Sequence, residues 1–141
     1  MDFNHFLTSY MPDTSIGSSK HFKNMVEECE TAEKLGYATV SIPEHHLINL
    51  LMMPSPLQMA VKIASVTKNI KITTGIVVLP LHDMRTYAGE VATADILTDG
   101  RLILGVGRGA FPWEMKRLGT PIEQSKDCLL YTSDAADDVY C

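Results

Sequence analysis

Three short stretches of the sequence hold the residue types that could do chemistry. Glu44-His45-His46 sets two imidazoles beside a carboxylate, and such a set can exchange protons, donate hydrogen bonds or bind a metal near neutral pH. His82-Asp83 pairs an imidazole with a second carboxylate, and the stretch from Gly105 to Gly109 places Arg108 among glycines. The chemistry open to these stretches is therefore proton transfer, metal binding or the binding of an anion.

A metal site is the weaker interpretation of the histidines. Adjacent side chains point apart, so Glu44-His45-His46 would need further ligands, such as His82 and Asp83, to enclose an ion. We expect no metal here. Two alternatives remain: one imidazole acts as an acid, a base or a hydrogen-bond donor, or these are polar loop residues that cap the end of a strand.

The glycine-rich stretch 105–109 could hold a phosphate, since glycines let backbone amides approach an anion and the Arg108 guanidinium offers two parallel hydrogen bonds. It is not a P-loop, because the Gly-Lys-Ser/Thr ending is missing, and it lacks the G-x-G-x-x-G spacing of a dinucleotide turn. Glycines that only relax a turn between a strand and a helix explain the stretch equally well.

Hydrophobic residues near these stretches also have two interpretations. Phe111 and Trp113 could lie against a planar ligand, but aromatic residues beside a proline are more often packed between helices, which is the role we favour. Met52 and Met53 could form a soft wall of a pocket or could fill the core.

The elements that must position these residues alternate along the chain. Strands are expected where apolar and β-branched residues run together, at residues 3–8, 38–42, 70–79 and 101–106. Helices are expected where apolar residues recur at three- and four-residue spacing, at residues 20–35, 56–64 and 86–97. Asp99-Gly100 supplies a turn, and Pro112 and Pro121 mark further helix starts.

Cap and breaker residues set the bounds of these elements. Ser18 or Ser19 can cap the first helix, and Gly36 can close it in the left-handed conformation. Pro43 and Pro80 lack the amide hydrogen that would continue a strand, so each should end one.

This alternation favours an α/β fold with a parallel sheet, because a parallel connection needs a crossover that is usually a helix. The strands are apolar at nearly every position, as in 76–79 and 102–104, which fits a sheet covered on both faces. All three chemical stretches follow strands. They should therefore meet at the carboxyl rim of the sheet, where the active sites of such folds gather.

The composition excludes several classes of function. The chain has 141 residues and a formal net charge of -5, with no basic stripe that would bind nucleic acid. No apolar run approaches the ~20 residues that span a membrane, and the N-terminus lacks a secretory signal, so we expect a cytoplasmic protein. Cys29 stands apart from Cys128 and Cys141 near the end, which argues against a disulfide framework or a zinc site.

From Phe3 to about Lys126 the sequence resembles the bacterial luciferase-like flavin monooxygenases. Three motifs carry the resemblance, and they occur in the family's order and spacing. These are Pro43-Glu44-His45-His46, Thr74-Gly75-Ile76-Val77-Val78-Leu79-Pro80, and Asp99-Gly100-Arg101-Leu102 leading into Gly105-Val106-Gly107-Arg108-Gly109. Each motif could occur alone by chance, but the three together are specific.

The resemblance implies a (β/α)8 barrel of the TIM type, of which this chain supplies the N-terminal half. It also implies reduced FMN bound at the carboxyl rim, and O₂ as the oxidant of a small organic substrate. His45 matches the family's active-site histidine, and Glu44 matches a carboxylate near the flavin face. Arg108, between Gly107 and Gly109, matches the arginine that reaches the flavin phosphate.

Further expectations follow from the same resemblance. The Gly75-Ile76 peptide aligns with a non-prolyl cis bond that lies against the flavin ring, so both residues are expected to contact the cofactor. Ile42 and residues 77–79 would add a dry apolar wall. The resemblance also implies a flavin reductase as a source of reduced FMN, and a dimer for the full-length protein.

Departures from the family pattern bear on the substrate. Asp83-Met84 stands where His-Pro is common, and Gly89 stands where a glutamate is frequent. Some relatives use the deazaflavin F420 and transfer hydride instead of activating oxygen, so an F420-dependent oxidoreductase is the alternative function. A non-catalytic flavin-binding relative is a third.

The chain beyond Asp127 departs from the family, which would continue a long helix there. Residues 128–137 read CLLYTSDAAD, identical to one translated frame of a transposase adaptor used in sequencing libraries. We therefore expect residues 1–127 to be a truncated luciferase-like domain and residues 128–141 to be a non-native tail. With about four of the eight strands, the fragment should have open sheet edges, bind flavin poorly and turn over no substrate.

Overall fold

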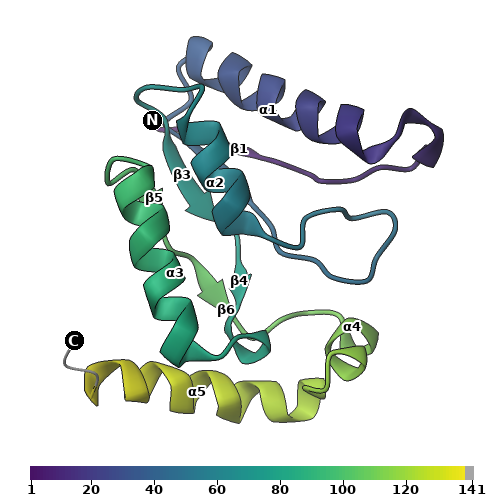
Figure 1. Ribbon diagram of the computed structural model, residues 1–141, viewed down its shortest axis with the longest axis vertical. Helices are drawn as coiled ribbons and strands as arrows, with labels where there is room; N and C mark the ends of the chain where they lie inside the picture. The colour runs from purple at the N-terminus through teal and green to yellow at the C-terminus, as the bar shows by residue number, and fades with distance from the viewer. Residues whose placement is uncertain (139–141) are drawn as a thin grey trace.

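Strands and helices alternate in the computed structural model, which describes residues 1–138, with side chains to Leu130 (Figure 1). The strands are β1 (Asn4–Phe6), β2 (Thr39–Ile42), β3 (Lys71–Thr74), β4 (Val77–Val78), β5 (Leu102–Ile103) and β6 (Val106–Gly107). The helices are η1 (Thr14–Ile16), α1 (Ser18–Lys34), α2 (Pro56–Ala64), η2 (Leu79–Leu81), α3 (Met84–Leu97), α4 (Pro112–Arg117) and α5 (Ile122–Asp138), with η denoting single 3-10 turns.

The paired strands are parallel, as the alternation predicted. β1, β2, β3 and β5 form one sheet in that order, and β4 pairs with β6 beyond it. Phe6 lies beside Ser41, Ser41 beside Thr73, and Thr73 beside Ile103. Because side chains alternate between the faces of a strand, this row lies on one face of the sheet. The shared direction brings the carboxyl ends of the strands to one rim.

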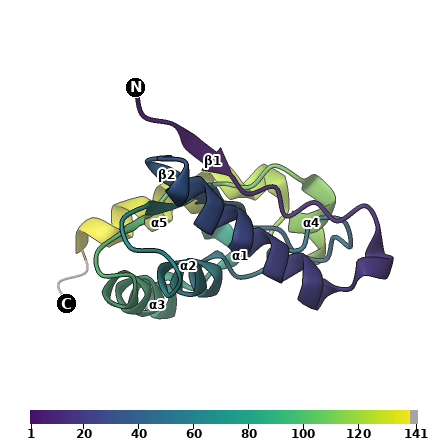
Figure 2. The same cartoon turned by 90° about the horizontal axis from the view of Figure 1, so that it is seen from above.

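Helices cover the opposite face. α2 packs between α1 and α3, and Figure 2 shows all three on the same flank of β1. The buried core between α1, α2 and the sheet includes Leu7, Met25, Cys29, Val40, Ile42, Ile63 and Ile72. A second cluster beside α3 contains Leu57, Val77, Leu79, Tyr87 and Ala94. The uncovered face leaves Phe6 and Ile103 50% and 41% exposed.

Two of the predicted strands are each broken in two, which corrects the expectation of continuous strands at 70–79 and 101–106. The break lies where Thr74 meets Gly105. The Thr74 hydroxyl donates to the carbonyl of Gly105 and accepts from its amide, both at 2.8 Å. A Cβ on Gly105 would lie 2.2 Å from the Thr74 carbonyl oxygen, so this approach requires glycine. The spacing of apolar residues does not reveal this break, because here a side-chain hydroxyl replaces the backbone hydrogen bonds between the two strands.

The start of α1 also differs from its prediction. Gly17 is the N-cap, Ser18 is already helical, and no side chain caps the helix, so neither Ser18 nor Ser19 has the expected role. Gly17 ends η1 with φ +76°, and the chain passes directly from that turn into α1. Gly36 has φ +81° and Pro56 begins α2, as expected.

Two charged side chains tie the turns at the amino end of the sheet. The Glu33 carboxylate accepts from the backbone amides of residues 68–70 at 2.7–3.1 Å. The Arg101 guanidinium donates to the carbonyls of Thr98 and Ala64 and to the hydroxyl of Thr67 at 2.8–3.0 Å. Arg101 thus joins the ends of α2 and α3 to the start of β5, away from the rim.

The strand order, the shared direction and the helices on one face are those of the first half of a (β/α)8 barrel. α4 follows β6, and α5 runs beneath η2 and α4 (Figure 1). α5 includes residues 128–138 of the proposed tail, whereas 139–141 lie outside the described residues. None of the described helices is long and apolar enough to cross a membrane.

Candidate active site

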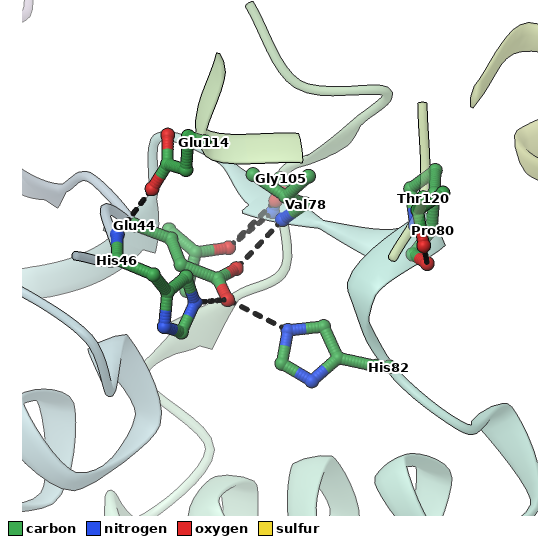
Figure 3. A network of polar contacts seen from close by, with 9 residues as sticks. Glu44, His46, Val78, Pro80, His82, Gly105, Glu114 and Thr120 are labelled. Carbon is green, nitrogen blue, oxygen red and sulfur yellow. Dashed lines mark hydrogen bonds and ion pairs between the residues drawn. The ribbon is translucent and has the colours of Figure 1, made fainter. Parts of the chain in front are cut away.

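Glu44 is the centre of a polar cluster at the carboxyl rim. It follows β2 and is 3% exposed. Its Oε2 accepts from the Val78 amide at 2.7 Å, and its Oε1 accepts from Nε2 of His46 at 2.7 Å and of His82 at 2.8 Å. Figure 3 shows these three donors converging on the one carboxylate. Glu44 therefore joins β4 to the segments that follow β2 and η2.

These contacts shift the pKa values of Glu44 and His46. Burial alone would raise the pKa of Glu44, but hydrogen bonds from His46, His82 and Val78 outweigh it and lower that pKa below its ordinary 4.5. The hydrogen bond to Glu44 raises the pKa of His46 above its ordinary 6.5, although burial opposes it. The pair therefore favours a carboxylate facing an imidazolium.

His82 has a role that the sequence did not indicate. The sequence offers it as a possible metal ligand, whereas in the structure it hydrogen-bonds to Glu44. Its ring stacks on Tyr87 in α3, with centroids 4.0 Å apart and planes 27° apart. The Tyr87 hydroxyl is buried and has no hydrogen-bond partner among the described residues, and burial raises its pKa. His82 thus connects the carboxylate to α3.

His45 points away from Glu44 toward α4. Its Nδ1 lies 3.6 Å from Oε2 of Glu114, and its ring centroid is 5.3 Å from that of Phe111. This nitrogen is buried and forms no hydrogen bond within the described part of the chain. Glu114 is 4% exposed and also accepts from the backbone amide of His46 (Figure 3). Phe111 therefore lies against the candidate site residue, not only between helices as we favoured.

A small cavity of about 70 Å³ lies where these groups meet. Its lining includes Glu44, His45, Gly75, Ile76, Val78, Gly109, Phe111 and Glu114. The Gly75-Ile76 peptide is cis, as the resemblance implied. Of the expected apolar wall, only Val78 lines this cavity, because Ile42, Val77 and Leu79 belong to the packed core.

Two glycines of 105–109 lie tightly against side chains of the protein itself. A Cβ on Gly107 would lie 2.2 Å from Cδ1 of Ile76, and one on Gly109, whose φ is +88°, would lie 2.7 Å from Sδ of Met115. That Gly107 and Gly109 contact the phosphate of the flavin stays a prediction. Arg108 is exposed, and its side chain forms no hydrogen bond or ion pair within residues 1–130.

The other candidates from the sequence lie in several places. The Arg117 guanidinium lies 5.4 Å from the centre of the Trp113 ring. Met53 is fully buried, and its carbonyl accepts from the His45 amide at 2.9 Å, whereas Met52 lines a pocket at the rim. In the part of the chain that the structure describes, no group of three or more His, Cys, Asp or Glu residues is placed to hold a metal ion.

The cavity brings together most of the predicted site residues. Those that line it are Glu44, His45, Gly75, Ile76 and Gly109, whereas Gly107 and Arg108 lie outside its lining. Glu114 was missed by sequence reasoning. It lies 68 positions from the His46 amide that it accepts from, and no motif marks it.

An α/β half barrel with a buried carboxylate and histidines at its carboxyl rim has the architecture of a barrel enzyme. Residues 1–129 match the family described as luciferase-like monooxygenase. The chain therefore belongs to the luciferase-like monooxygenases, as its motifs indicated, and the match extends two residues past the predicted domain boundary at 127.

A curated relative carries a flavin in its name. The chain is 35% identical over 97 residues to the oxygenase component of flavin-dependent trigonelline monooxygenase from Acinetobacter baylyi, a match that covers 69% of this chain and 27% of that protein. The chain spans about a third of the length of the curated relatives it matches.

Solved structures share the fold. The oxygenating constituent of 3,6-diketocamphane monooxygenase from Pseudomonas putida, in complex with FMN, matches with a TM-score of 0.82 at 21% identity over 96% of this chain and 39% of that one. The coenzyme F420 dependent tetrahydromethanopterin reductase from Methanopyrus kandleri matches with a TM-score of 0.62 at 22% identity over 85% and 30%. These likenesses confirm the partial barrel predicted from the sequence.

Proposed function

We propose that this chain is part of an FMN-dependent monooxygenase that uses reduced FMN and O₂ to oxygenate a small organic substrate. The observation that carries the proposal is the rim cavity where His45 meets the Gly75-Ile76 peptide. Family membership supports the reaction class. The flavin-dependent relative and the FMN complex among the similar structures support the cofactor.

The rim residues fit a flavin in three respects. The Nδ1 of His45 is a buried polar atom without a hydrogen bond in the described residues, and such atoms normally have a partner. Ile76 is 37% exposed beside Gly75 and offers an apolar surface to a planar ring. Arg108 is exposed just beyond β6, where a bidentate guanidinium can pair with a phosphate.

The chain's own residues would divide the work. FMN, when bound, supplies the redox chemistry. His45 would donate or accept a proton at its imidazole, and the Glu114 carboxylate, 3.6 Å from its Nδ1, would orient the ring. The Glu44 carboxylate is occupied by three donors, so we assign it a positioning role toward His46, His82 and β4.

Three further features belong to this proposal. A separate flavin reductase would supply reduced FMN, and the whole protein would act in the cytoplasm as a dimer. The exposed side chains of Ile96 and Leu97 on α3, 74% and 57% exposed, support the dimer because a second subunit would cover them. Sedimentation of the complete protein at twice the subunit mass would agree with this, and a monomer at all concentrations would not.

The test uses the protein encoded by the complete reading frame of the source DNA. We expect it to consume O₂ when reduced FMN and a substrate are supplied, and His45→Ala to lower kcat/KM by about 100-fold or more, the usual contribution of a general acid or base. A variant that forms product at the wild-type rate would exclude the role of His45.

The second candidate is an F420-dependent oxidoreductase, which the structural likeness to the F420-dependent reductase favours. It predicts that the protein retains F420 in preference to FMN and turns over without oxygen. A non-catalytic flavin-binding protein predicts binding without turnover under either condition. The same binding and oxygen measurements therefore separate the three functions.

We also propose that residues 128–141 are a non-native tail. The identity of residues 128–137 to a translated adaptor frame supports this assignment. Long-read sequencing of the source DNA past the codon for Asp127 tests it. A frame that continues into further strands supports the proposal, whereas a genome that encodes 128–141 and then a stop codon contradicts it.

A further inference from the structure

A second, larger pocket lies at the rim on the other side of His45. It has a volume of about 500 Å³, within the range of small-molecule sites, and His45 lines both this rim pocket and the small cavity. The rim pocket is formed by the loops that follow β1 and β2. Its apolar wall consists of Met11, Leu47, Ile48, Leu51 and Met52.

The two loops that form the rim pocket are tied together by their backbones. The Met11 amide donates to the Leu50 carbonyl at 2.8 Å, and the Met52 amide donates to the Ser9 carbonyl at 3.0 Å. Tyr10 and Leu51 form an isolated antiparallel bridge between the same loops. The wall is therefore held by paired backbone, which favours a pre-formed site.

Charge is the informative property of the rim pocket. Its lining contains no Asp, Glu, Lys or Arg, and besides His45 its polar side chains are Thr14 and Asn49. A buried charge without a partner is costly, so this wall would disfavour an anionic or cationic ligand. The hydroxyl of Thr14, the amide of Asn49 and the imidazole of His45 offer hydrogen bonds that suit a neutral oxygen instead.

Leu47 is the most exposed part of this wall. Its side chain is 57% exposed, and its backbone has φ +57°, a conformation that a leucine rarely adopts. The structure thus places a large, partly exposed apolar side chain in the wall of the pocket, on a backbone conformation that costs free energy.

We propose that the rim pocket binds the substrate, and that this substrate is an uncharged, largely aliphatic molecule carrying a neutral oxygen. The inference rests on the proposed function, because it presents the substrate to a flavin across His45. The pocket accepts neutral ketones, alcohols and related compounds, and it rejects carboxylates, sulfonates and ammonium compounds.

The test compares three probes of equal chain length with the 141-residue chain: 2-octanone, octanoate and octylammonium. Affinities are measured by saturation-transfer NMR titration at pH 7.5. We expect 2-octanone to bind about tenfold more tightly than either ion, since an unpaired charge loses solvation in this wall. Equal affinity for an ion, or no binding of 2-octanone, would overturn the proposal.

Substitutions at Leu47 sharpen the test, because Asp readily adopts a positive φ. Leu47→Asp should weaken 2-octanone binding about tenfold, and Leu47→Lys should reverse the preference in favour of octanoate. Leu35→Asp is the matched control, since Leu35 is 71% exposed at the end of α1, at the opposite end of the sheet. Unchanged binding in both Leu47 variants, or a loss in the control as large as theirs, would refute the assignment.

Failure of this inference is distinguishable from failure of the proposed function. FMN is titrated against the protein from the complete reading frame, with and without 2-octanone. If the protein binds FMN but does not discriminate between the probes, the proposed function stands and the proposed substrate class is wrong. If the protein binds 2-octanone selectively but does not bind FMN, the assignment of the rim pocket stands and the proposed flavin-dependent function is wrong.

Discussion

Glu44 is the residue whose environment most constrains the rim. A buried carboxylate is stable only when its charge is compensated, and here three donors compensate it. Its neighbour His45 instead keeps a buried nitrogen without a hydrogen bond in the described residues. Of the two adjacent positions, Glu44 therefore holds the segments of the rim together, and His45 is the residue that we propose acts on a ligand.

Glu44→Gln should remove a pH-dependent part of the stability. The folded pKa of Glu44 is below 4.5, so its contribution is present above pH 4.5 and lost as pH falls through the folded value. The folded pKa of His46 is above 6.5, so its contribution is full below pH 6.5 and lost as pH rises through the folded value. The Glu44–His46 pair should therefore stabilise the folded protein most between pH 4.5 and pH 6.5.

Urea unfolding from pH 4 to 9 measures this effect. We expect Glu44→Gln to lower the free energy of unfolding by about 3 kcal/mol near pH 6, as for a broken buried ion pair. The profile of the variant should also be flatter than that of the wild type. Glu28→Gln is the control, because that half-exposed carboxylate lies 3.6 Å from His5. Parallel wild-type and Glu44→Gln profiles would contradict the pH dependence.

At the scale of elements, the breaks in the strands create the rim. Gly105→Ala should destabilise the protein by about 2 kcal/mol or more, because its Cβ would lie 2.2 Å from a backbone oxygen of Thr74. Gly89→Ala is the control within α3: nothing lies within 4 Å of its Cβ, and alanine should stabilise that helix by about 0.5–1 kcal/mol. Thermal unfolding monitored by circular dichroism checks both, and a tolerated Gly105→Ala would refute the close approach.

The Arg101 guanidinium should be a second determinant of element packing. Arg101→Met removes its hydrogen bonds to two carbonyls and a hydroxyl and should cost about 2–3 kcal/mol, since the carbonyls then lose a charged donor. Arg85→Met should leave the unfolding midpoint unchanged, because Arg85 is 89% exposed and, among the described residues, its ion pair is with Asp83 at the surface. Equal unfolding midpoints for Arg101→Met and Arg85→Met would argue against the role of Arg101 in joining α2, α3 and β5.

The sequence predicted the helices and strands, but it did not predict where two of the strands are interrupted. Apolar spacing identified α1, α2 and α3, and their alternation with strands predicted the parallel sheet and the shared rim. It did not predict the interruption at Thr74 and Gly105, because one hydroxyl replaces ladder bonds there. Nor did it indicate Glu114 or the role of His82, since both depend on contacts between distant segments.

At the scale of the whole molecule, β1 and β5 are the edges of the described four-stranded sheet. Its uncovered face presents apolar side chains beside those edges, including Phe6 and Ile103. Unpaired parallel edges with apolar neighbours are templates for further strands. In a complete barrel, further strands would pair with both edges.

The 141-residue chain should therefore associate as its concentration rises. Ile103→Lys places a charge on the edge strand β5 and should reduce this association, whereas Leu35→Lys, at the exposed end of α1, should leave it unchanged. Sedimentation velocity over a concentration series measures the difference. Equal association of both variants with wild type would exclude the open edge as its cause.

We propose that flavin binds at this rim with its phosphate at Arg108. The most direct test measures the affinity of the complete-frame protein for FMN and for riboflavin, which lacks the phosphate, in wild type and Arg108→Ala. We predict that FMN binds more tightly than riboflavin, and that Arg108→Ala weakens FMN about tenfold while leaving riboflavin unchanged. Equal losses for both ligands, or no loss of FMN affinity, would contradict this placement of the cofactor.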